Sequence, residues 1–150
     1  MWLDALLAYL HFSAVFVLFA FLTVEVMLAR GDLDARAVGL LRRVDYWYVG
    51  AAIAALVTGV SRAIWGAKGW GFHSGDGVFW LKVAAFSVVA ILSIAPTRAY
   101  GRWKRLADAG PGFVVPEEER RRMRRYLMGE LHVAALIPLL AVIMSRGLWR

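Results

Sequence analysis

Several ionisable side chains interrupt long apolar stretches of this sequence, and an ionisable group inside a membrane span is a functional candidate by default. They are His11 and Glu25 in the first stretch, Arg62 in the second, Lys82 in the third, and Glu130 with His132 in the fourth. Imidazole ligates iron and titrates near neutral pH, so His11 can act as an axial haem ligand or as a proton carrier. These residue types point to redox or proton chemistry inside a bilayer.

A helix rise of ~1.5 Å per residue places these side chains in two layers. The outer basic group consists of His11, Arg62 and Lys82, and the inner group consists of Glu25, Glu130 and His132. Arg62 and Lys82 could hold haem propionates, or another anionic or carbonyl-bearing ligand that dissolves in lipid. His11 and His132 lie more than ~10 Å apart along the membrane normal, so one iron cannot use both.

Each member of the outer basic group also has a structural interpretation. His11 can be a core histidine that bonds a neighbouring serine or carbonyl. Arg62 and Lys82 lie near enough to the outer interface to extend their charged ends to lipid headgroups.

The inner group has structural alternatives as well. Glu25 can pair with Arg30 or Arg43. Glu130 and His132 are two positions apart, on nearly opposite sides of a helix, so only one of them can face the interior. We expect Glu130 to be an interfacial residue near the preceding basic run.

The composition requires lipid as the solvent, because 61% of the residues are hydrophobic and the mean hydropathy is positive. A spanning helix needs roughly 20 mainly apolar residues. Such runs cover approximately 3–29, 47–65, 78–99 and 127–145. The sequence therefore predicts an all-α, four-helix integral membrane bundle that forms a single domain over residues 1–150. Cysteine is absent, which excludes disulfides and Cys-ligated metals.

Helical spacing indicates which faces turn inward. His11, Leu18 and Glu25 are seven residues apart and share one stripe. Small residues on the second span allow a neighbouring helix to come close, either within the chain or in a homodimer. They are Gly50, Ala51, Ala54, Ala55 and Gly59.

The net charge of +7 comes from basic residues gathered next to the spans, so we expect anionic lipid rather than nucleic acid as the partner. Residues 30–43 and 98–125 carry most of these bases and are predicted to be cytoplasmic. The N-terminus, the loop after the second span, and the C-terminus with Arg146 and Arg150 carry few, so both termini are predicted to be non-cytoplasmic. Pro116 and the acids after it predict a helix that runs unbroken into the fourth span.

Short motifs carry a family resemblance over nearly the whole chain. They are Leu10-His11, Thr58-Gly59-Val60-Ser61-Arg62, Gly66-Ala67-Lys68-Gly69, Phe79-Trp80-Leu81-Lys82 and Ser93-Ile94-Ala95-Pro96-Thr97. The sequence resembles a bacterial family of four-span membrane proteins classed as a domain of unknown function. That family is distantly similar to HemJ-type protoporphyrinogen oxidases and to CopD-type membrane domains. The resemblance implies a multi-pass protein of the bacterial inner membrane.

The distant similarity also implies a site. HemJ-type proteins bind haem b and carry a functional His in the first span and a Lys after a Trp in a later span, and His11 and Lys82 match these positions. The chain lacks their usual Trp-Phe-Gly and Tyr-His patterns, which argues against porphyrinogen oxidation itself. Copper has less support, because the methionines show no paired ligand spacing.

Two functional hypotheses follow, and they leave open whether the protein is an enzyme. The first is a haem-binding membrane protein with a redox role towards a quinone-like or porphyrin-like substrate, with His11 as the metal ligand and Arg62 and Lys82 as anion clamps. The second is a small non-enzymatic membrane protein that acts as a carrier, a proton pathway or an assembly partner. In the proton pathway, Glu25, His11 and His132 are the stations.

Overall fold

The computed structural model of the chain describes residues 2–147. The helices in these residues are α1 (Trp2–Leu28), α2 (Ala35–Trp65), α3 (Gly69–Ser74), α4 (Gly77–Ala109) and α5 (Glu117–Arg146). All except α3 are long and apolar enough to cross a membrane. The predicted all-α architecture with four spanning helices is therefore confirmed. Arg150, one of the basic residues named in the orientation prediction, lies outside the described residues.

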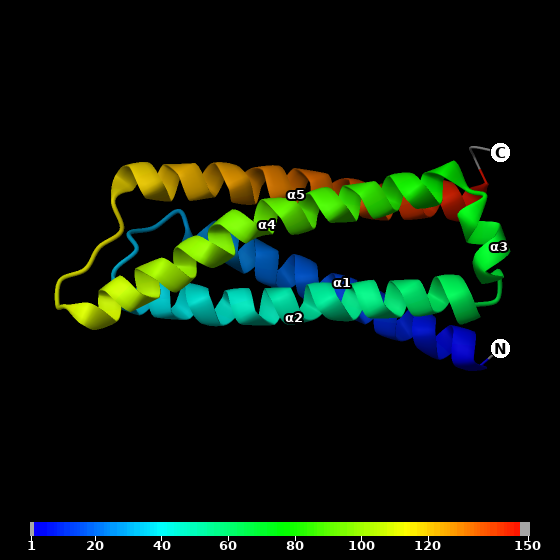
Figure 1. Cartoon of the computed structure of the whole chain (residues 1–150), viewed down its shortest axis with the longest axis horizontal. Coiled ribbons are helices and arrows are strands. Elements are labelled where there is room, and N and C mark those ends of the chain that lie inside the picture. Colours follow the sequence, from blue (N-terminus) through cyan, green and yellow to red (C-terminus); the bar gives the residue numbers. More distant parts are fainter. Residues whose placement is uncertain (1, 148–150) are drawn as a thin grey trace.

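The four long helices run along one common direction, with α1 crossing α2 obliquely (Figure 1). The most extensive packing joins α1 to α2 and α4 to α5, and α2–α4 and α1–α5 contacts connect the two pairs. The start of α1, the end of α5 and the short α3 lie at one end of the bundle. The segments that follow α1 and α4 lie at the opposite end, which we call the loop end.

Large apolar side chains cover the outside of the bundle. Phe16, Ile53, Ile91 and Leu139 are all more than half exposed. Apolar surface of this extent is unfavourable in water, and it fits helices whose solvent is lipid.

Local sequence signals explain where the helices begin. The side chain of Asp34 accepts a hydrogen bond of 2.8 Å from the backbone N of Ala37, and Asp76 accepts one of 2.9 Å from Val78. Both aspartates therefore cap the first turn of a helix, α2 and α4 respectively. The helix predicted after Pro116 is confirmed, because α5 starts there and continues without a break through its apolar part.

Two hydrophobic clusters fill the interior. The central core consists of Leu18, Leu22, Val26, Ala29, Tyr48, Ala51, Val89, Leu127 and Ala134. The end core lies toward the loop end and consists of Leu33, Val38, Leu41, Ala99, Tyr100, Trp103, Val115 and Met123. The two loops meet beside the end core, where the Val115 backbone N donates to the Leu33 carbonyl at 3.0 Å. The loop end is thus a packed region.

The end core also explains why α2 and α4 extend beyond the apolar runs in the sequence. α2 begins twelve residues before Trp47, the start of its apolar run, and α4 continues ten residues beyond Ala99. These extensions contain charged residues, which lower their mean hydropathy, but their inward faces bury Val38, Leu41 and Trp103. Helical packing of one apolar face keeps the extensions folded.

The absence of native cysteine makes the orientation directly measurable. We expect Ala67→Cys, between α2 and α3, to react with a membrane-impermeant maleimide in intact cells, because the loop has few basic residues. Ala109→Cys, at the opposite end, should react only after permeabilisation. Both positions are exposed. The reverse labelling pattern would contradict the predicted orientation, and the cysteine-free wild type gives the background.

Candidate functional site

His11 is held in the contact between α1 and α2. Its Nδ1 lies 3.1 Å from the Ala55 carbonyl oxygen and 3.2 Å from Thr58 Oγ1. The ring packs on Gly59, where an added Cβ would lie 3.0 Å from His11 Cε1. Glycine thus provides the space for the imidazole. The contacts match the structural interpretation of His11 as a core histidine bonded to a neighbouring carbonyl.

Arg62 lies near the end of α2 and Lys82 near the start of α4, at the same end of the bundle as the start of α1 (Figure 1). Both side chains are partly buried and contact aromatic rings. The Arg62 guanidinium carbon is 5.4 Å from the Phe12 ring centroid, and Lys82 Nζ is 5.9 Å from that of Phe79. The structure therefore brings the outer basic group together, while its role in holding a cofactor stays a prediction.

Glu25 is buried at the other level of the bundle, with 2% of its surface exposed. Tyr100 donates a hydrogen bond of 3.3 Å to its Oε2. Its Oε1 has no hydrogen-bond partner among residues 2–147. The alternative pairing of Glu25 with Arg30 or Arg43 is wrong, because the carboxyl group points into the bundle.

Glu130 corrects one sequence-based expectation. It was expected at the interface, but only 1% of its surface is exposed, and the Tyr48 hydroxyl donates to its Oε1. His132, two positions later, is exposed on the outside of α5 and bonds the Met128 carbonyl. Since a step of two residues turns a helix by about 200°, burial of Glu130 forces His132 outward.

Asp45 is a buried carboxyl that the sequence analysis missed. It is 1% exposed, and it accepts bonds of 2.6 Å each from Arg42 and Thr97. It lies just before the apolar run that begins at Trp47. The charged residues of this segment led to its interpretation as part of a loop. The signal that could have revealed it is the spacing of Leu41, Asp45 and Tyr48, which fits one helical face.

These residues form one buried group, which we call the carboxyl cluster. It contains Glu25 from α1, Asp45 and Tyr48 from α2, Tyr100 from α4 and Glu130 from α5. Thr97 and Tyr100, one turn apart on α4, bond Asp45 and Glu25 respectively. Tyr48, one turn after Asp45 on α2, bonds Glu130, so the three carboxyls share one region. Tyr48 belongs to the central core and Tyr100 to the end core. The cluster is therefore a polar layer between two hydrophobic ones.

The composition of the carboxyl cluster limits its chemistry. Arg42 pairs with Asp45 at 2.6 Å, whereas Glu25 and Glu130 have tyrosine hydroxyls as partners and form no ion pair among residues 2–147. Within the same residues, no group of three or more His, Asp or Glu side chains is arranged to hold a metal ion. The arrangement suits binding of protons.

The bond between Tyr48 and Glu130 should contribute to stability. Tyr48→Phe removes the hydroxyl and leaves a buried carboxyl without its donor, which costs about 1–3 kcal/mol. We expect a correspondingly lower free energy of unfolding in detergent micelles. Tyr9→Phe is the matched control, because Tyr9 is exposed on the outside of α1. An equal effect of both substitutions would contradict a specific role for the buried hydroxyl.

Comparison with known proteins places the whole chain in one family. Residues 3–148 match the family model described as "Predicted membrane protein (DUF2214)". No curated protein and no solved structure matches the chain, so the expected similarity to HemJ-type and CopD-type proteins stays a prediction. The match covers nearly all of the four spanning helices, and it confirms the resemblance to a membrane protein family of unknown function. The chain belongs to the DUF2214 family of membrane proteins.

Proposed function

We propose that this protein is a non-enzymatic membrane protein that conducts protons, with the carboxyl cluster as its proton-binding site. One observation carries the proposal: Glu25 and Glu130 are buried between helices, and among residues 2–147 each has a tyrosine hydroxyl and no cation as its partner. Burying two acids of this kind in one region lowers the stability of the fold, so a purely structural role does not account for them.

The physical basis is the cost of charge in a low-dielectric interior. An ionised carboxylate that leaves water loses several kcal/mol even after the protein relaxes. A cation can compensate it, as Arg42 does for Asp45. Glu25 and Glu130 have no such cation in the described part of the chain, and a bound proton removes the charge instead. Glu25 Oε1, which no described residue hydrogen-bonds, is the position available to that proton.

The tyrosines add a route between the acids. A hydroxyl both donates and accepts hydrogen bonds, so Tyr48 and Tyr100 can pass a proton as well as stabilise a carboxylate. Tyr48 bonds Glu130, and Tyr100 bonds Glu25. Each hydroxyl thereby connects α2 or α4 to an acid on another helix, and proton transfer between the two acids requires water or side-chain motion between them.

His11 is the second station of the pathway, because imidazole titrates near neutral pH. His11 lies seven residues before Leu18, on the same stripe of α1 as Leu18 and Glu25. The side chains of Leu18, Leu22 and Ala51 separate the two levels. Proton passage requires this apolar layer to admit water. His132 is dropped from the pathway, because it is exposed on the outer surface of α5.

Proton flux into liposomes tests the proposal. Purified protein is reconstituted with a pH-sensitive dye inside, and a potassium gradient with valinomycin drives protons inward. We expect flux with the wild type, and with Glu25→Gln a flux reduced to that of protein-free liposomes, because the amide cannot take up the proton. Glu118→Gln is the control, since Glu118 is exposed near the start of α5.

Two results would contradict the proposal. One is wild-type flux equal to that of protein-free liposomes, and the other is full flux in both Glu25→Gln and Glu130→Gln. The variants are compared with the wild type by thermal unfolding and gel filtration before reconstitution. A folded Glu25→Gln variant without flux separates proton binding from structural support.

Haem binding is the second candidate, and the orientation of His11 favours it. Nδ1 bonds the Ala55 carbonyl at 3.1 Å, and this bond favours the tautomer whose Nε2 has a free lone pair. A bound haem b would supply one-electron chemistry, with His11 as ligand and Arg62 and Lys82 near its propionates. The residue types therefore fit the group, although the close packing of the ring against Gly59 leaves little space on that side.

An absorption spectrum tests this second candidate. If haem binds, the purified protein, with haemin added where it is colourless, should show a Soret band that shifts on reduction. His11→Ala should remove the band, because it removes the ligand. His132→Ala should leave the band unchanged, because His132 is exposed on the outside of α5 and belongs to the inner group, away from His11. Absence of a band in haemin-treated wild type would contradict haem binding.

The same proposal includes the cellular setting. We place the protein in the bacterial inner membrane as a multi-pass protein, with anionic lipids around its basic loop end. The small residues of α2 are partly used inside the chain, since Ala51 and Ala55 are buried and Gly59 contacts His11. A homodimer would use the part of that face that stays exposed, Gly50 and Ala54.

A further inference from the structure

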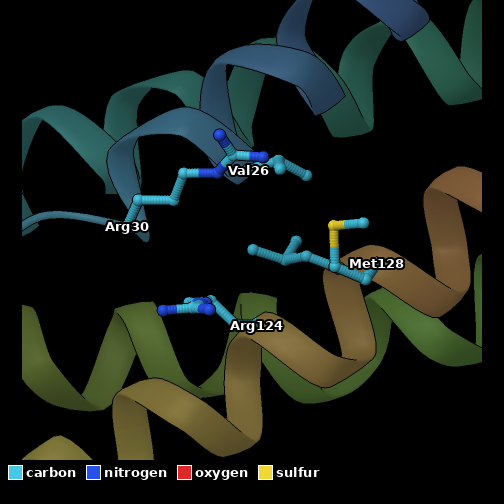
Figure 2. Close-up of a pocket in the computed structure, with 5 residues that line it drawn as sticks. Val26, Arg30, Arg124 and Met128 are labelled. Carbon is cyan, nitrogen blue, oxygen red and sulfur yellow. The ribbon is translucent and has the colours of Figure 1, made fainter.

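A cavity of about 230 Å³ lies between the loop end of α1 and the facing part of α5. Its walls are Val26, Arg30, Arg124, Leu127 and Met128. Figure 2 shows Val26 and Arg30 on the α1 side of the space and Arg124 and Met128 on the α5 side. Two positive charges thus border one cavity between membrane-spanning helices.

The two guanidinium groups differ from that of the nearby Arg120, which has several partners. Among residues 2–147, no side-chain hydrogen bond or ion pair satisfies Arg30 or Arg124. By contrast, Arg120 donates to the Gly31 carbonyl at 2.8 Å and to Asp32 at 2.6 Å, and it also pairs with Glu117. Asp32 and Glu117 pair with Arg120, and no acidic side chain is among the residues that line the cavity, which leaves it with an uncompensated positive charge.

The remaining walls are apolar. Val26 and Leu127 are buried, whereas Met128 reaches the outer surface of α5. Arg30 follows the end of α1 by two residues, at the level where a spanning helix leaves the hydrocarbon. A ligand for this cavity therefore needs a negative group for the arginines and an apolar part for the rest of the walls.

We propose that this cavity binds the phosphodiester headgroup of an anionic phospholipid. Guanidinium groups form charge-assisted, often bidentate, hydrogen bonds with phosphate oxygens. Basic pockets between spanning helices on the cytoplasmic side are suited to such headgroups. The glycerol and the start of an acyl chain contact Val26, Leu127 and Met128. This site is independent of proton conduction, and it rests on the proposed cytoplasmic position of the loop end.

A second cavity at the loop end differs from the first in the charge of its lining residues. It has a volume of about 480 Å³ and is lined by Leu92, Glu118, Arg122, Arg125 and Tyr126. There, the carboxylate of Glu118 lies with the two arginines and would repel a phosphate. The cavity between Arg30 and Arg124 has no acidic side chain among its lining residues, so charge complementarity favours the smaller cavity.

Lipid titration of the delipidated protein in detergent, followed by native mass spectrometry, tests the site. The probes are phosphatidylglycerol, phosphatidylcholine and inorganic phosphate. We expect phosphatidylglycerol to bind more tightly than the other two. The double variant Arg30→Ala/Arg124→Ala should weaken its binding at least about tenfold, because two charge-assisted bonds are lost.

Arg36→Ala/Arg105→Ala is the matched control. It removes the same charge from exposed positions on α2 and α4 that do not line the cavity. An equal loss in both double variants would overturn the site in favour of general attraction to a basic surface. Equal binding of phosphatidylcholine would overturn the need for an anionic headgroup. If inorganic phosphate displaces the lipid at equal concentration, the result would overturn the proposal that the ligand is a phospholipid.

Discussion

The low dielectric of a membrane protein interior imposes the main constraint on this structure, because every buried polar group needs a partner inside the bundle. Glu25, Asp45 and Glu130 come from three different helices, and the fourth supplies Tyr100 and Thr97. The carboxyl cluster therefore connects all four spanning helices. Their packing depends on aligning these groups, since a shift of one helix would leave a buried acid without its donor.

The carboxyl cluster lies between the two hydrophobic cores. The central core separates the carboxyl cluster from His11, and the end core covers it toward the loops. Trp103, which is nearly fully buried in the end core, donates a bond of 2.7 Å from Nε1 to Glu119 and so ties the loop end of α4 to the start of α5. Glu25 and Glu130 thus lie between two apolar layers that limit their contact with water. The same architecture both stabilises the acids and restricts access to them.

Much of the fold and part of the site were predictable from the sequence. The four spans, the helix beginning after Pro116 and the inward stripe of His11, Leu18 and Glu25 all follow from apolar length and helical spacing. Glu130 and Asp45 were not placed correctly. Both lie where charged residues adjoin an apolar run, and there hydropathy cannot distinguish an interfacial acid from one that faces a partner on another helix. Tyr48 and Tyr100 carry no sequence signal of their role, because it depends on acids 82 and 75 residues away.

The sequence by itself determined that the protein is helical and crosses a membrane, because apolar length and periodicity are local properties that act along one segment. The tertiary structure decided which ionisable residues share a site. It joined Glu25, Asp45 and Glu130, turned His132 outward, and left Arg30 and Arg124 around one cavity. The physical reason is that the partners of a buried charge come from other helices, whose rotation and depth are fixed only when all four pack together.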